Sequence, residues 1–293
     1  MPERTAKWRK QLRKLLLRRR GIGIAVCLLV AALVLILILI LVLPAPEEEV
    51  PTPAETLLLE DEPVLLVTAE QMSRLRYVDS ELGEFQWSLS GEPLQELNRV
   101  LEEYNIRESE EICQFLAQAT VESGAGRYLT EYGTEEYFES RGYTAGTRGA
   151  GYLHLTHDYG QMAFATWMMK KYVPELADIR YVNPAHHGKE SITEAYYEAL
   201  RLAVNLGLNV SRYTRIVYDE NSPVTTGADY IASAFAWESA AYYWSAAGIG
   251  DAFPAQSGVE NTDTASKLIG GSNWQSRREA YLAFYPVLSE VSQ

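Results

Sequence analysis

A run of 23 uncharged residues at positions 21–43, GIGIAVCLLVAALVLILILILVL, limits the possible folds of this chain more than any other feature. As an α-helix rising about 1.5 Å per residue, it would reach roughly 34 Å and cross the hydrocarbon core of a bilayer. A cleaved signal peptide has a shorter apolar region that ends in small residues. Here Leu43-Pro44 ends the run instead, so we expect residues 21–43 to be a transmembrane signal anchor.

The charges before this run predict its orientation. Residues 1–20 form a basic arm of net charge +8, with Glu3 and nine basic residues: Arg4, Lys7, Arg9, Lys10, Arg13, Lys14, Arg18, Arg19 and Arg20. Basic residues beside a membrane span stay in the cytoplasm. We therefore expect a single-pass protein of the cell membrane, with its N-terminus in the cytoplasm and its C-terminal part outside.

The part after the run is strongly acidic. The whole chain carries a net charge of −13, so residues 44–293 carry −21 once the +8 of the arm is set aside. Such a charge repels nucleic acid, and no nucleic-acid partner is expected. Residues 44–66 are rich in Pro and Glu, which predicts an extended acidic linker between the membrane and a domain at 67–293.

Helical periodicity dominates this domain. Apolar residues recur at helical spacing in two early segments: Leu94, Leu97, Val100 and Leu101 in one, and Ile112, Phe115, Leu116 and Ala119 in the next. A Gly-, Tyr- and Thr-rich stretch at 124–160 predicts loops and a short hairpin. Further helices are expected near 161–172, 190–206, 226–247 and 275–290, so the domain is predicted to be mainly α.

Glu122 is the residue most suited to chemistry. Cleavage of a glycosidic bond usually needs a carboxylic acid to protonate the leaving oxygen and a second carboxylate to activate water or attack. Glu122 ends an apolar helical pattern and precedes Ser123-Gly-Ala-Gly126. Desolvation at the end of a buried helix would raise the pKa of its carboxyl, as a proton donor requires. Taken alone, a Glu in this position is more often a surface residue.

A series of short segments in the domain forms a recognisable order. They are VTAEQM (67–72), LNRVLEEYNI (97–106), FLAQATVES (115–123), YFESR (137–141), GAGYLHLTHDY (149–159), ASAFAWESAAYYW (232–244) and KLIGGSNWQSRREAY (267–281). Together they resemble glycoside hydrolase family 19, the chitinases and endolysins of lysozyme-like fold. The resemblance implies an α+β domain in which a small β-hairpin and loop region lines a cleft.

The resemblance also implies roles for two acids. Glu122 would be the general acid, and Glu139 would be the base that activates water in an inverting displacement. Glu136, Glu131 and Glu135 lie nearby and remain open as alternatives for the base. No cofactor and no metal are expected.

Further positions would contact the sugar or the attacking water by the same resemblance. Thr156 matches the residue that holds the water, His154 replaces a substrate-binding Gln, and Tyr152 offers a ring face. The closing motif supplies Asn273 and either Arg277 or Arg278. The chain departs from the family at Val121, Ala150, His154 and Asp158, which leaves the substrate less defined than the reaction.

Residues 173–225 exceed what the family has at this point and are expected to be an insertion.

We expect hydrolysis of a β-1,4-linked, GlcNAc-containing polysaccharide, either peptidoglycan or chitin. Two alternatives stay open: a lytic transglycosylase that uses a single Glu, and a non-catalytic wall-binding protein on the same fold.

Overall fold

The computed structural model describes residues 65–79, 83–253 and 258–290. The chain divides into two units, Met1–Glu60 and Asp61–Gln293, and every described residue belongs to the second. The basic arm, the expected anchor at 21–43 and nearly all of the 44–66 linker lie outside the described residues. Within the described part, no helix is both long enough and apolar enough to cross a membrane.

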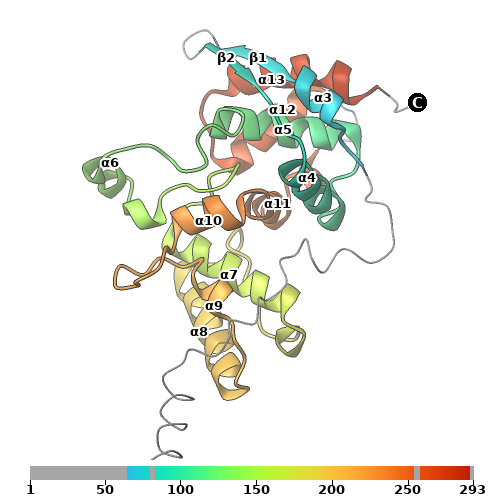
Figure 1. The fold of residues 1–293 in the computed structure, drawn as a ribbon. Helices are drawn as coiled ribbons and strands as arrows, with labels where there is room; N and C mark the ends of the chain where they lie inside the picture. The colour runs from blue at the N-terminus through green and yellow to red at the C-terminus, as the bar shows by residue number, and fades with distance from the viewer. Residues whose placement is uncertain (1–64, 80–82, 254–257, 291–293) are drawn as a thin grey trace, which may run out of the picture. The chain divides into compact units, whose positions relative to one another are not determined.

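The domain is mainly helical, as the sequence predicts (Figure 1). The helices are α3 (Ala69–Arg74), α4 (Glu92–Glu103), α5 (Ser109–Ser123), α6 (Glu135–Ser140), α7 (Asp158–Tyr172), α8 (Lys189–Asn205), α9 (Ser211–Thr214), α10 (Ala228–Ala234), α11 (Ala236–Ala246), α12 (Val259–Ile269) and α13 (Trp274–Leu288). Short 3-10 turns occupy Ala145–Thr147 (η1), Pro174–Leu176 (η2) and Gly250–Ala252 (η3).

The hairpin lies elsewhere than the sequence analysis expects. The described residues form one two-stranded antiparallel sheet, β1 (Arg76–Asp79) and β2 (Gly83–Gln86), and it precedes α4. Between 124 and 160, where the described chain forms α6 and η1, the strand-like pairing consists of isolated bridges, such as Thr130 with Ala150. Repeated positive φ angles interrupt extended backbone there, at Gly124, Ala125, Gly126, Gly142, Gly151, His154 and His157.

Two hydrophobic cores support the fold. The first surrounds α5 and joins α4, α11, α13 and the β-hairpin, with Trp87, Phe115 and Trp237 among its buried side chains. The second joins α7, α8, α9 and α10. Helix α11 contributes to both, because Trp237 packs in the first core while Tyr242 packs in the second.

Residues 173–225 build part of the second core. Helix α8 packs against α7 and buries an apolar stripe of Ile192, Ala195, Tyr196, Ala199 and Ala203. The segment expected to be an insertion is therefore integrated into the domain.

A buried carboxylate links three helices. Glu238 on α11 is 1% exposed and forms an ion pair with Arg99 of α4. Lys171 of α7 lies 3.0 Å from Glu238 Oε1, and the hydroxyl of Tyr104 donates to the same oxygen at 2.6 Å. A buried charge is tolerated when it is paired and hydrogen-bonded in this way.

Candidate functional site

Helix α5 brings Glu122 to a sharp change of chain direction. The helix ends at Ser123 because Gly124 adopts the left-handed conformation, with φ +59°. Ser123 Oγ then accepts from the amide of Gly126 at 2.9 Å and closes the turn. Glu122 is thereby held in the last turn of a buried helix, with its side chain 18% exposed.

Arg277 binds one oxygen of this carboxylate. It lies in the first turn of α13, which packs along α5, and its Nη2 donates to Glu122 Oε1 at 2.5 Å. Its Nη1 donates to Gln118 Oε1 at 2.5 Å, and its Nε donates to the carbonyl of Ser272 at 2.9 Å. The Arg277 side chain is only 3% exposed, so its guanidinium is fixed on three sides.

His154 faces the other oxygen. Its Nδ1 lies 3.5 Å from Glu122 Oε2, and its Nε2 lies 3.1 Å from the carbonyl oxygen of Tyr128. The backbone of His154 is left-handed, with φ +49°. Thr156 stabilises this turn by donating from Oγ1 to the His154 carbonyl at 2.6 Å.

The charges around Glu122 determine its ionisation. Burial alone would raise the pKa of its carboxyl, but His154 and Arg277 more than reverse this effect and lower the pKa to about 2. Burial lowers the pKa of His154, yet the neighbouring carboxylate outweighs it and leaves that pKa above its ordinary value. The isolated domain therefore holds Glu122 as a carboxylate, contrary to the raised pKa that the sequence analysis expects.

A second carboxylate, Glu131, lies beside this group. Its Oε2 accepts from the amide of Gly149 at 3.2 Å, and its own amide donates to the Gly149 carbonyl at 2.8 Å. A Cβ added to Gly149 would lie 2.8 Å from His154 Cβ and 3.4 Å from Glu131 Cβ. The side chains of Glu131 and His154 therefore flank the same glycine.

Two tyrosine hydroxyls orient Glu131. Tyr143 donates to both of its carboxylate oxygens, at 2.8 and 2.9 Å, and Tyr137 donates to Oε1 at 3.0 Å. From the sequence, Glu131 was only an alternative for the base, because its partners come from positions up to 18 residues away. The many tyrosines in this loop were the sequence feature that could have pointed to Glu131.

Glu139 has a different environment. It lies on α6, which projects from the neighbouring helices in Figure 1, and it is exposed. Among the described residues, its carboxylate makes no hydrogen bond and no ion pair. The buried residue of α6 is Phe138, so the helix directs Glu139 away from the packed side.

Of the remaining expected contacts, Thr156 lies near Glu122, beside His154, as described above. Tyr152, Asn273 and Arg278 have other surroundings. Tyr152 is 6% exposed and stacks on Trp237 with ring centroids 3.5 Å apart. Asn273 is exposed and precedes α13 with φ +58°. Arg278 donates from Nε to Asp263 Oδ1 at 2.7 Å. Of the two arginines left open by the sequence, Arg277 is the one that contacts Glu122.

Tyr243 also lies in the field of Glu122. It belongs to α11, and burial together with the Glu122 charge raises the pKa of its phenol to about 12. Its hydroxyl donates to the carbonyl of Ile269 at 3.0 Å. Tyr243 belongs to the segment ASAFAWESAAYYW (232–244), from which no role for it was expected.

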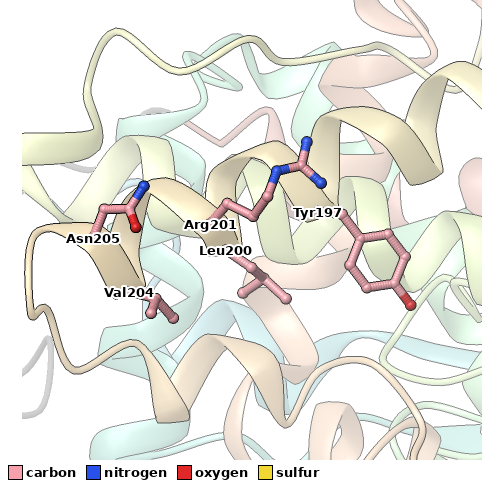
Figure 2. A pocket seen from close by; sticks show the side chains of 5 residues that line it. All are labelled: Tyr197, Leu200, Arg201, Val204 and Asn205. Carbon is pink, nitrogen blue, oxygen red and sulfur yellow. The ribbon is translucent and has the colours of Figure 1, made fainter.

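A shallow pocket lies along α8 (Figure 2). Tyr197, Leu200, Arg201, Val204 and Asn205 line it, and all five belong to that one helix. None of these residues contacts Glu122, His154 or Arg277. The described part of the chain also holds no group of three or more His, Cys, Asp or Glu side chains placed to bind a metal ion.

Comparisons with family models, curated proteins and solved structures gave no match for this chain. The resemblance to glycoside hydrolase family 19 therefore rests on the ordered sequence segments alone.

Proposed function

We propose that residues 67–293 are a glycoside hydrolase domain of lysozyme-like α+β fold that cleaves β-1,4-linked, GlcNAc-containing polymers. The observation that carries this proposal is the environment of Glu122. Its carboxylate is largely buried at a helix end, and it is held by Arg277 on one oxygen and by His154 on the other. Side chains with perturbed pKa values and specific charge partners gather preferentially at functional sites.

Glu122 is proposed as the group that protonates the leaving oxygen. Its exposed fraction of 18% leaves part of the carboxylate accessible, while Arg277 limits its rotation. A fixed acid near the bond lowers the barrier because the donor is already oriented.

Glu131 is proposed as the second carboxylate, in place of Glu139. Tyr143, Tyr137 and the Gly149 amide fix its two oxygens, and it neighbours His154 across Gly149. An oriented carboxylate of this kind can remove a proton from a water molecule that attacks the sugar. Glu139 lacks any such support among the described residues.

The expected anchor at 21–43 bears on the substrate. An extracytoplasmic domain tethered to the membrane meets the cell wall, which favours peptidoglycan, while the family resemblance favours chitin. Both polymers present β-1,4-linked GlcNAc, so we propose that shared chemistry as the substrate class.

Digestion of peptidoglycan and of chitin oligomers by the full-length chain in detergent tests the proposal. The parent should release new reducing ends, and Glu122→Gln should lower the rate by roughly 10² to 10⁴-fold because the amide cannot donate the proton. Glu175→Gln is the matched control, since Glu175 is exposed in η2, and it should retain parental activity.

The products distinguish the alternatives. Ends carrying 1,6-anhydro sugars would identify a lytic transglycosylase, in which the sugar's own hydroxyl attacks. Binding of the polymer without any cleavage would identify a non-catalytic wall-binding protein. Parental activity in Glu122→Gln would contradict the assignment of Glu122.

A further inference from the structure

We propose that His154 stores the proton that Glu122 delivers to the leaving oxygen, so that His154 is a positioning residue for the acid. This inference rests on the proposed function, and it assigns His154 a role other than the substrate contact implied by the resemblance.

The hydrogen bonds of the imidazole determine where its protons lie. The carbonyl oxygen of Tyr128 can only accept, so Nε2 of His154, 3.1 Å away, must carry a hydrogen. A neutral imidazole with that tautomer would present a bare Nδ1 lone pair to Glu122 Oε2, 3.5 Å away. Two acceptors facing each other would repel, so one proton belongs between His154 and Glu122.

No other neighbour of Glu122 in the described part of the chain can supply this proton. The Arg277 guanidinium is already bound to Glu122, to Gln118 and to the carbonyl of Ser272. Tyr243 has its pKa raised to about 12 by burial and by the Glu122 charge, and its hydroxyl is directed to the Ile269 carbonyl. Among the described partners of Glu122, His154 is the one with an imidazole, the side chain that ordinarily exchanges its proton near neutral pH.

The groups that face the pair favour the charged imidazole. Glu122 on α5 and Glu131 in the adjoining loop both raise the pKa of His154, as does the Tyr128 carbonyl. Arg277 on α13 faces Glu122 and offsets part of that negative charge. Burial acts in the opposite direction, but the net effect raises the pKa of His154.

The backbone of His154 adopts an uncommon conformation. A residue other than glycine rarely adopts a φ of +49°, and the conformation persists where the surroundings enforce it. The Thr156 hydroxyl binds the His154 carbonyl, and Gly149 leaves room for the His154 side chain. Such strain gathers at functional sites.

The hydrogen on His154 Nδ1 passes to Glu122 Oε2, which gives a carboxylic acid and a neutral imidazole that keeps its Nε2 hydrogen. The acid proton then passes to the glycosidic oxygen as the bond from the sugar carbon to that oxygen breaks, and the bonding electron pair stays on the oxygen. The oxygen of the attacking water bonds to that sugar carbon while Glu131 takes one of the water protons. Solvent then returns a proton to His154 and removes one from Glu131.

The first experiment compares the pH profiles of the full-length parent, His154→Gln and the control His186→Gln. His186 is exposed in the loop before α8 and makes no contact with Glu122. The reactive form contains one proton shared by Glu122 and His154, so parental kcat should persist until His154 loses that proton. In His154→Gln the alkaline limb should move down by about 2 pH units or more, because only a carboxyl remains to hold the proton.

The two kinetic constants separate this role from substrate binding. At pH 7.5, His154→Gln should lower kcat by at least about tenfold while KM changes less than about threefold. A higher KM with an unchanged kcat, or a parental pH profile, in His154→Gln would overturn the proton-storage role. If either of these results came together with an inactive Glu122→Gln variant, the proposed hydrolase function would still hold.

A second measurement does not depend on activity. The chain has four histidines, so ¹⁵N-histidine spectra of the full-length protein can be assigned with single variants. Nε2 of His154 should stay protonated throughout, Nδ1 should titrate above the ordinary histidine range, and Glu122→Gln should lower that midpoint by about one unit or more. An unchanged midpoint, or a neutral form with hydrogen on Nδ1, would refute the inference even if the parent cuts no glycan.

Discussion

Arg277 on α13 joins two side chains of α5, donating to Glu122 Oε1 and to Gln118 Oε1, each at 2.5 Å. Gln118 and Glu122 are four residues apart and therefore lie on the same side of the helix. A carboxylate in the last turn of a helix is disfavoured by the helix dipole. The Arg277 guanidinium offsets that cost and fixes the start of α13 on the end of α5.

Arg277→Met should destabilise the domain by about 3 kcal/mol, because it leaves Glu122 and the buried Gln118 without their charged partner. Urea unfolding of the parent and the variant measures this. Arg278→Met is the matched control and should change stability little, since Arg278 pairs with Asp263 where its side chain is 42% exposed. Equal stability of Arg277→Met and the parent would contradict the described pairing.

The Glu122–His154 pair should stabilise the domain within a defined pH window. The pKa of Glu122 is lowered from 4.5 to about 2, so its contribution is complete above 4.5 and is lost as the pH falls toward 2. The pKa of His154 is raised above 6.5, so its contribution is complete below 6.5 and is lost as the pH rises through the folded value. The pair therefore contributes most between pH 4.5 and 6.5.

Melting temperatures of the parent and of His154→Gln across this range check the window. The difference between them should be largest near pH 5 to 6 and should shrink above neutral pH and below about pH 4. A difference that stayed constant with pH would mean that His154 stabilises the domain by packing alone.

Regular apolar periodicity explains which helices the sequence could predict. Helices α4, α5, α7, α8 and α13 match the expected segments closely. Helix α12 was missed because it buries polar side chains, Asn261, Thr262 and Ser266, rather than an apolar stripe. Ser266 accepts from Gln118 of α5 at 3.2 Å, so a polar contact replaces the usual hydrophobic one.

The break between α10 and α11 was also invisible in the sequence. The chain turns at Phe235, with φ −146°, where neither Gly nor Pro signals a stop. Tertiary packing overrides local propensity there, since Phe235 is buried in the second core.

The candidate site was only partly predictable for a related reason. Glu122 was found because a helix end and a motif coincide, and Arg277 because the closing motif names it. The position of Glu131 depends on loop contacts with Tyr143 and Gly149, which follow no sequence period. Several glutamates in one loop therefore looked equivalent until their hydrogen bonds were known.

The Glu238 cluster should be a major source of stability away from the site. Arg99→Met would leave a carboxylate that is 1% exposed without its closest cation, at an expected cost of about 3–5 kcal/mol. Urea unfolding would measure this cost, with Arg107→Met as the control, because the ion pair between Arg107 and Glu102 is half exposed. Cleavage by surviving folded protein should be unchanged, since neither arginine contacts Glu122.

The expected anchor predicts that the domain lies outside the cytoplasm. Protease added to intact spheroplasts should remove residues 67–293, because the basic arm keeps the N-terminus inside. An epitope placed before Met1 should stay protected until the membrane is permeabilised. Full protection of the domain would refute this orientation and remove the argument for a wall substrate.

Glu131 and Glu139 give opposite predictions for the second half of the reaction. Glu131→Ala should abolish hydrolysis, because the water would lose its oriented base, while Glu139→Ala should retain near-parental turnover. Assays of both variants on the polymer that the parent cuts decide between them.

Azide provides the stereochemical test of the same assignment. In Glu131→Ala, a small anion can enter the space left by the carboxylate and attack from the side opposite the leaving group. An inverting site would then convert a β-linked substrate into an α-glycosyl azide, with Glu122 still protonating the leaving oxygen. If azide instead rescued Glu139→Ala, Glu139 would be the base. If both variants kept full activity and gave 1,6-anhydro products, the sugar would supply its own nucleophile.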